Sequence, residues 1–202
     1  MKLHWSPKSP YVRKVMVCAH ELGLVHRIEL VRSVAAMLTP NERLMLDNPL
    51  SKIPTLVLED GSTLFDSVVI CEYLDTLAGG GRLFLERSEL KWQALRWHAL
   101  GDGLIDVLIL WRNEREREVP LARLLSAFDL KAQAALRALD REAVHLELAP
   151  FSIGHIAIAC ALGYLDYRLD TVGWRQIAPR LRAWHDQVRH RPALALTEPR
   201  EG

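Results

Sequence analysis

Two prolines that lie close together, Pro49 and Pro54, constrain the fold of this chain more than any other feature. Pro49 biases the residue before it towards extended geometry, so a helix should end just before it. Pro54 opens the short apolar run 55–58. Because proline cannot donate to a sheet ladder, Pro54 belongs at the first residue of a strand or at a sheet edge. The stretch 48–58 therefore predicts a helix end followed by a strand that begins at an open edge.

A hairpin and a helix are predicted after this strand. The residues Glu59-Asp60-Gly61-Ser62 carry the Asp-Gly signature of a tight turn, and 63–65 is a second short strand. Asp66-Ser67 then suits the N-terminal cap of an apolar helix over 68–74. Open amides at a helix start beside a free strand edge predict a site for an anion or a peptide. Most hairpins that lead into a helix nevertheless bind no ligand.

The residues before position 48 predict an alternation of strands and helices. The expected elements are a strand over 2–5, a helix over 10–22, a strand over 26–31, a loop over 32–40 and an irregular helix over 41–47. Ser9 and Pro10 suit the N-cap and first turn of the first helix, and Gly23 suits its C-terminal end. A right-handed crossover should make the first two strands parallel.

Gly79-Gly80-Gly81 is the clearest break in the chain. Three consecutive glycines cannot continue a helix cheaply, so we expect a first domain over 1–78, a linker over 79–87 and a helical second domain over 88–202. Two apolar patterns at helical spacing predict long antiparallel helices in the second domain. The patterns are Leu90, Ala94, Trp97, Gly101, Leu104, Leu108 and Trp111, and then Leu121, Leu124, Phe128, Ala132, Ala135, Leu139, Ala143 and Leu146. The run 156–165 is apolar on every side and predicts a central helix.

Composition and charge narrow the possible functions. The net charge of the 202 residues is +1, which gives no argument for capture of nucleic acid or of an anionic membrane. Cys18, Cys71 and Cys160 lie far apart, which disfavours a disulfide scaffold and favours a reducing compartment. No signal peptide is evident, and the run 156–165 is too short to cross a bilayer. We therefore expect a cytoplasmic protein, and the eight histidines show no metal-ligand spacing, so we expect no metal.

Three stretches of the chain resemble the glutathione S-transferase superfamily. They are Lys52-Ile53-Pro54-Thr55-Leu56 with Phe65-Asp66-Ser67 after a turn, Ser6-Pro7-Lys8-Ser9-Pro10-Tyr11-Val12-Arg13-Lys14-Val15, and 157–168. The resemblance implies an α+β N-terminal thioredoxin-like domain with a mixed four-stranded sheet, followed by an all-α C-terminal helical bundle domain. It also implies a cis peptide bond before Pro54 and a homodimer built along 73–77 and 91–106.

The resemblance implies a glutathione site whose parts have a clear chemistry. Asp66 and Ser67 suit the γ-glutamyl end of the tripeptide, because an anion is stabilised at a helix start. Ile53, exposed by Pro54, would pair backbone to backbone with the cysteinyl unit, and Lys52 is placed for the glycine carboxylate. Ser9 would be the catalytic hydroxyl at the sulfur, although it also suits a simple helix cap.

A second substrate is expected between the two domains, beside the loop at Lys8. Candidate contacts are Tyr11, His98, Trp111 and Arg112, although a tryptophan at a seam position is more often part of the core. In some classes of the superfamily a tyrosine of the first strand acts on the sulfur, but Trp5 stands there in this chain.

These features favour a glutathione transferase, with two alternatives left open. In the transferase, a thiolate stabilised by Ser9 attacks an electrophilic carbon in a mostly apolar pocket. The same thiolate could serve a disulfide or peroxide reductase. However, the segment Ser9-Pro10-Tyr11-Val12 aligns with the Cys-Pro-Tyr-Cys motif of glutaredoxins without either cysteine, which argues against dithiol exchange there. A binding or regulatory module that has lost turnover is the third possibility.

One residue departs from the pattern of the superfamily. The central helix usually starts with Ser or Thr and an Asp three residues later, and here these positions are Ser152 and His155. A neutral imidazole can accept from the Ser152 amide, whereas a protonated one cannot, and the helix dipole opposes its charge. We therefore predict a lowered pKa for His155 in the folded protein.

Overall fold

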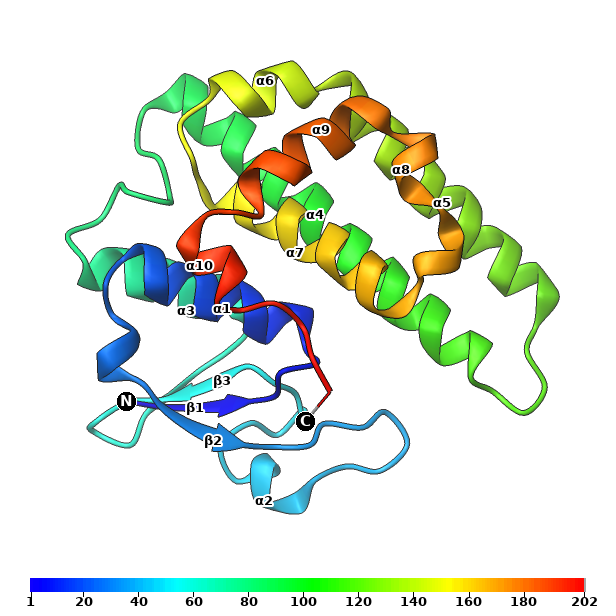
Figure 1. The fold of residues 1–202 in the computed structure, drawn as a ribbon. Coiled ribbons are helices and arrows are strands. Elements are labelled where there is room, and N and C mark those ends of the chain that lie inside the picture. The colour runs from blue at the N-terminus through cyan, green and yellow to red at the C-terminus, as the bar shows by residue number, and fades with distance from the viewer. Residues whose placement is uncertain (202) are drawn as a thin grey trace.

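A four-stranded mixed sheet forms the first part of the chain (Figure 1). Its strands are β1 (Lys2–Trp5), β2 (Glu29–Arg32), β3 (Thr55–Val57) and β4 (Thr63–Leu64), in the spatial order β2-β1-β3-β4. β2 runs parallel to β1, whereas β3 is antiparallel to β1 and β4 is antiparallel to β3. The computed structural model describes residues 1–201, except for the side chain of Ser88.

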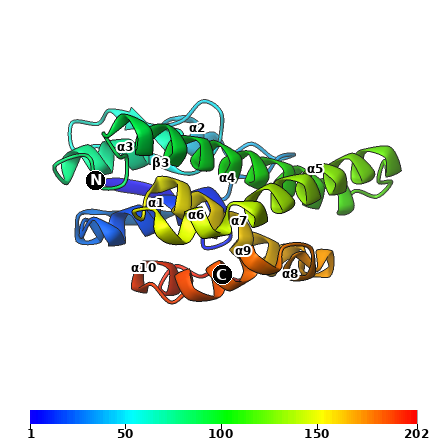
Figure 2. The same ribbon diagram turned by 90° about the horizontal axis from the view of Figure 1, so that it is seen from above.

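Helices make up most of the remaining described chain. They are α1 (Pro10–Glu21), α2 (Glu42–Met45), α3 (Ser67–Leu77), α4 (Ser88–Arg115), α5 (Ala122–Arg141), α6 (Ala143–Leu148), α7 (Ile153–Arg168), α8 (Trp174–Ile177), α9 (Pro179–Val188) and α10 (Pro192–Ala195). Figure 1 shows α1 and α3 on one face of the sheet and the longer helices beyond them, and Figure 2, seen from above, shows α4 and α5 extending away from the N-terminal elements. The predicted fold class, a mixed four-stranded sheet with helices followed by a helical bundle, is confirmed. No helix within residues 1–201 has the length and apolar character needed to cross a membrane.

The start of α1 follows the local signals in the sequence. Ser9 is the N-cap, and its side-chain oxygen accepts a hydrogen bond from the Val12 amide at 3.3 Å. Pro10 occupies the first helical position, where no intrahelical bond from its nitrogen is needed. Gly23 follows the helix at φ +73°, a left-handed conformation that favours glycine. The apolar face of α1, which includes Val15, is buried against α3 and α7.

The second strand begins later than the sequence predicts. The sequence indicates a strand over 26–31, whereas Val25–Arg27 forms a 3-10 turn and β2 spans Glu29–Arg32. The parallel register pairs Lys2 with Glu29. β2 therefore pairs with β1 only from Glu29 onward. The 3-10 turn connects the end of α1 to that position.

The second apolar pattern belongs to two helices, not to one. α5 ends at Arg141 and α6 begins at Ala143, with Glu142 between them. The carboxylate of Glu142 accepts from the Trp97 indole at 2.6 Å and from Arg96 Nη1 at 2.9 Å, both on α4. These bonds fix the chain against α4 at the point where the helix is interrupted.

Two glycines allow α4 and α7 to approach closely. A Cβ built on Gly101 of α4 would lie 2.8 Å from the backbone carbon of Ala157 in α7. A Cβ built on Gly154 of α7 would lie 2.6 Å from the Ala94 carbonyl oxygen of α4. Backbone atoms in a packed helix pair cannot move aside independently. Gly103, on the same helix as Gly101, faces open space instead.

We expect Gly101→Ala to lower the free energy of unfolding by about 1–3 kcal/mol, because the added methyl group overpacks the crossing of α4 and α7. Gly103→Ala is the matched control, and it should raise the free energy of unfolding by about 0.5–1 kcal/mol because alanine favours the helix. Urea unfolding of both variants measures the difference. Equal changes in the free energy of unfolding for the two variants would contradict a close contact between Gly101 and α7.

Ser152 and His155 form a reciprocal cap at the start of α7. Nδ1 of His155 accepts from the Ser152 amide at 3.1 Å, and Nε2 donates to the Leu146 carbonyl at 2.9 Å. Together these bonds require the neutral ring with its hydrogen on Nε2. Burial, with a smaller contribution from the charge of Arg191, holds the pKa of His155 below its ordinary value, although the bond to Leu146 opposes the shift. The predicted direction is confirmed.

Stability should decline as the pH falls through the unfolded-state pKa of His155, near 6.5. Below this pH the His155 ring binds a proton in the unfolded chain but not in the folded one. In His155→Asp the carboxylate still accepts from the Ser152 amide down to about pH 4. The loss of stability near pH 6.5 should therefore be absent from this variant. Urea unfolding over a pH series measures the slope, and His190→Asp, at an exposed histidine, is the control. Parallel profiles for wild type and His155→Asp would refute the role of the cap.

Candidate functional site

Three segments meet at one end of the sheet. Ser9 follows the carboxyl end of β1 through the short loop 6–9. β3 is antiparallel to β1, and its register pairs His4 with Thr55, so Pro54 lies at that same end. β4 is antiparallel to β3, so Asp66 lies there as well, after the end of β4. The topology therefore brings the predicted catalytic and binding segments together.

The segment before β3 offers free backbone groups. The peptide bond between Ile53 and Pro54 is cis, with Pro54 buried, Ile53 half-buried and Lys52 exposed. No hydrogen bond among the described residues uses the amide or carbonyl of Ile53. An extended peptide that adds to a sheet edge needs such a donor and acceptor.

Asn48 holds this segment in place, a role that sequence reasoning missed. Its side-chain amide donates to the Lys52 carbonyl at 3.2 Å and to the Thr55 hydroxyl at 2.9 Å, and it is buried. The Thr55 hydroxyl in turn donates to the Lys52 carbonyl at 2.9 Å. The sequence signal is an asparagine before Pro49, which by itself indicates only the end of a helix.

Asp66 caps α3 and leaves the start of that helix open to solvent. Its Oδ1 accepts from the Val68 amide at 2.9 Å, while the side chain as a whole is exposed. Ser67 occupies the first helical position and is buried. Because the first amides of a helix have no intrahelical acceptors, this end attracts an anion.

Tyr11 lies between the two parts of the chain. Its hydroxyl donates to the carboxylate of Asp106 on α4. Burial and the Asp106 carboxylate raise the pKa of Tyr11, with smaller contributions from the charges of Asp102 and Asp66. The phenol is therefore a hydrogen-bond donor and not a base. The contribution from Asp66 also places the start of α3 within electrostatic reach of Tyr11.

His98 does not line an open substrate site, contrary to the sequence-based expectation. It is buried, with Nε2 at 3.1 Å from Lys14 Nζ and at 3.2 Å from Asp102 Oδ2. Lys14 is 0% exposed, and its Nζ lies 2.5 Å from the same Asp102 oxygen. Sequence reasoning missed Lys14 because charged residues on one side of a helix usually face solvent. In the structure other helices cover that side of α1. Lys14, His98 and Asp102 together form a buried ionic cluster.

The remaining two expected contacts divide between core and surface. Trp111 is only 7% exposed and belongs to the core. Arg112 is half-buried, with its Nε 3.5 Å from the Glu116 carboxylate one turn further on. Of the four candidate contacts, Tyr11 and Arg112 are therefore the two that are not buried.

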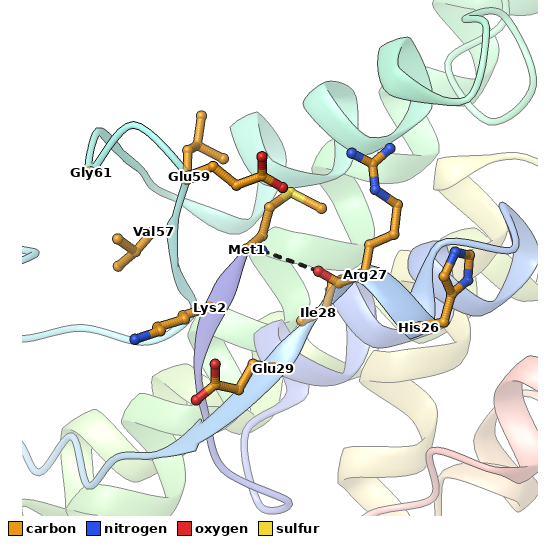
Figure 3. Close-up of a pocket in the computed structure, with 10 residues that line it drawn as sticks. Met1, Lys2, His26, Arg27, Ile28, Glu29, Val57, Glu59 and Gly61 are labelled. Carbon is orange, nitrogen blue, oxygen red and sulfur yellow. Dashed lines mark hydrogen bonds between the residues drawn. The ribbon is translucent and has the colours of Figure 1, made fainter.

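A cavity of about 520 Å³ lies at the opposite end of β1 from Ser9 (Figure 3). It is lined by the start of β1 at Met1 and Lys2, the turn at Arg27 and the end of β3 at Val57. Figure 3 shows the Met1 ammonium pointing to the Arg27 carbonyl, to which it donates at 3.2 Å. None of the residues expected to bind glutathione lines this cavity.

All three cysteines lie in the core of the structure. Cys18, Cys71 and Cys160 are buried free thiols, and burial raises the pKa of Cys160 to about 11. Within the part of the chain that the structure describes, no three His, Cys, Asp or Glu side chains are placed to hold a metal ion.

Both parts of the chain match one family of proteins. Residues 8–77 match the glutathione S-transferase N-terminal domain, and residues 122–187 match the glutathione S-transferase C-terminal domain. The uncharacterized GST-like protein YibF of Escherichia coli (strain K12) is 32% identical in an alignment of 207 positions that covers 98% of each chain.

Solved structures extend the similarity to proteins with a ligand. A glutathione transferase family member from Pseudomonas fluorescens Pf-5 with bound glutathione is 39% identical, with a TM-score of 0.94 over 99% of each chain. A glutathione S-transferase from Methylobacillus flagellatus KT with glutathione bound is 33% identical, with a TM-score of 0.89 over 98% of this chain and 99% of that one. A second Pseudomonas fluorescens Pf-5 structure, 38% identical with a TM-score of 0.90 over 100% of both chains, holds S-(propanoic acid)-glutathione. The chain described here therefore belongs to the glutathione S-transferase family.

Proposed function

We propose that this protein is a glutathione transferase that binds glutathione where the segments of Ser9, Pro54 and Ser67 meet. The observation that carries the proposal is the free backbone donor and acceptor of Ile53 at that end of the sheet, beside the open start of α3. Two relatives, 39% and 33% identical, hold glutathione, which supports glutathione as the ligand.

Each part of the tripeptide has a complementary group in the proposed site. The Asp66 carboxylate receives the γ-glutamyl ammonium, and the Ser67 end of α3 receives the γ-glutamyl carboxylate. The cysteinyl unit pairs with the Ile53 backbone. The exposed ammonium of Lys52 is placed for the glycine carboxylate.

Ser9 supplies the hydrogen bond to sulfur in this proposal. A free thiol has a pKa of about 8.5, and only its thiolate is a good nucleophile. The Ser9 oxygen accepts from the Val12 amide, so its own O–H remains available to donate to the thiolate. The thiol proton passes to solvent, the thiolate forms a carbon–sulfur bond, and the leaving group departs with its electron pair. A relative that holds S-(propanoic acid)-glutathione, a glutathione substituted at sulfur, favours a carbon electrophile.

Asp66→Asn tests the binding step without removing the cap of α3, because asparagine and aspartate cap helices equally well. We expect it to weaken glutathione binding about tenfold, since a charge-assisted hydrogen bond to the ammonium becomes a neutral one. The measurement is isothermal titration of glutathione into the wild type and the variant. Asp60→Asn, in the turn between β3 and β4, is the control and should bind like the wild type.

Two outcomes of this titration would contradict the proposal. The first is wild-type protein that gives no saturable heat with glutathione. The second is equal weakening by Asp66→Asn and Asp60→Asn, because the effect would then be one of overall charge and not of a contact.

A further inference from the structure

Arg13 is a buried cation that forms no ion pair with any residue that the structure describes. Its side chain is 6% exposed, and its Nη2 donates to the Leu194 carbonyl at 3.2 Å. Nε and Nη1 are buried and have no acceptor among the described residues. A guanidinium stays charged at every physiological pH. Burying a charge without a counter-charge is unfavourable, so this arrangement is suited to an anion.

A cavity of about 180 Å³ lies beside Arg13. α1, α7, α9 and the segment after α10 border it, and its lining includes Tyr167, His185 and Arg189. Figure 1 shows the segment after α10 running past α1 towards the carboxyl end of β1. The volume is roughly six times the share of one water molecule in the liquid, about 30 Å³. A small polyatomic anion therefore fits.

Gly163 makes room for the guanidinium. A Cβ built on Gly163 would lie 2.0 Å from Arg13 Nη1. Glycine in the interior of a helix is less favourable than alanine, and Gly163 lies within α7. The guanidinium of Arg13 therefore occupies space that only glycine leaves free.

The carboxylates at the cavity already have partners. Asp166 accepts from Arg175 Nη2 at 2.8 Å, and Glu198 accepts from Arg189 Nη2 at 3.0 Å. Neither forms an ion pair with Arg13. The side chains that line the cavity therefore supply no ion-pair partner for Arg13.

His185 is a second polar group that lacks a partner at this cavity. It is 4% exposed, and its Nδ1 is buried without a hydrogen bond among the described residues. Burial lowers the pKa of His185 to about 4, with the charges of Arg175, Arg13 and Arg189 acting in the same direction and Asp166 opposing them. The ring is therefore neutral near neutral pH, and Nδ1 can carry the hydrogen and donate it.

We propose that this cavity binds a small oxyanion, held by Arg13 with His185 and Arg189 as further donors. A guanidinium suits carboxylate and phosphate oxygens because its planar array of N–H groups matches their geometry. None of the residues proposed to bind glutathione lines the cavity. The oxyanion site is thus separate from the glutathione site, and the two proposals can fail independently.

The test is a titration of the wild-type protein with sodium formate and, separately, with sodium phosphate, at constant ionic strength and near neutral pH. The His185 ring resonances, assigned with His185→Gln, report binding at the cavity itself. We expect a saturable shift with at least one of these probes, planar or tetrahedral, and no saturable shift at the exposed His190. Shifts that stay linear and unsaturated with both probes would overturn the proposal.

Two variants connect the binding to Arg13. Arg13→Met keeps an unbranched side chain in place of the aliphatic part of arginine but removes the guanidinium, so it should weaken the binding at least tenfold. Gly163→Ala should have the same effect by displacing the guanidinium. Arg182→Met, at an exposed arginine of α9, is the control and should titrate like the wild type. Unchanged binding in either test variant would overturn the proposal, and the wild-type titration decides it if neither variant folds.

Discussion

Replacing Ser9 by alanine should lower kcat/KM for conjugation of glutathione about 10²–10³-fold, the usual cost of removing one hydrogen-bond donor to a developing or bound anion. The physical reason is the pKa of the bound thiol. Without the hydroxyl the thiolate is less favoured, and each unit of rise in that pKa corresponds to about 1.4 kcal/mol. Steady-state kinetics with an electrophile panel at saturating glutathione measures the loss.

The control must separate catalysis from folding, because Ser9 also caps α1. Loss of the cap should cost about 1 kcal/mol of stability by itself. Ser9→Thr keeps both the hydroxyl and the cap, so it should retain most of the turnover. Ser6→Ala removes another hydroxyl from the same loop and should leave turnover unchanged. If Ser9→Ala is less stable but as active as the wild type, Ser9 is a helix cap and nothing more.

Asp102→Ala should lower the free energy of unfolding by about 3–5 kcal/mol, the largest effect on stability that we expect. The substitution leaves Lys14, which is fully buried, without its carboxylate at 2.5 Å. Burial opposes ionisation of Asp102, but the His98 hydrogen bond and the Lys14 charge hold its pKa below the ordinary value. Its contribution is therefore present above about pH 4 and is lost as the pH falls below the ordinary carboxyl pKa, near 3.9.

A second variant distinguishes a lost attraction from an unpaired charge. Lys14→Met combined with Asp102→Leu removes both charges and should recover most of the stability lost in Asp102→Ala, because apolar side chains replace buried ion pairs at little cost. Glu147→Ala, at an exposed carboxylate of α6, is the control and should change stability by less than about 1 kcal/mol. Chemical denaturation of the four proteins measures these differences. A double variant no more stable than Asp102→Ala would contradict the role of the unpaired lysine.

The elements that the sequence predicts well are those whose local signals agree with their surroundings. Ser9 with Pro10 fixes the start of α1, Asp66 fixes the start of α3, and the apolar run in α7 places that helix in the core. Each of these signals acts within a few residues, so its effect does not depend on contacts with distant parts of the chain. The division into domains at 79–87 stays a prediction, in a region where α3 ends at Leu77 and α4 begins at Ser88.

The features that escaped prediction depend on partners far away in the sequence. Arg13 and Lys14 look like a solvated helix face, yet α7 and α4 cover them, and their contacts come from Leu194 and Asp102. The break at Glu142 coincides with bonds to α4 that no local pattern reveals. A charge on a helix face therefore predicts exposure only where no other helix packs on that face.

The pKa of the glutathione thiol when bound to this protein tests the central claim most directly. The ultraviolet absorbance of the thiolate, followed over a pH series at saturating glutathione, gives this value for wild type and for Ser9→Ala. We predict a value below the ordinary thiol pKa of about 8.5 in the wild type and a return towards it in Ser9→Ala. A bound thiol that titrates at the same pH in both proteins would contradict the account.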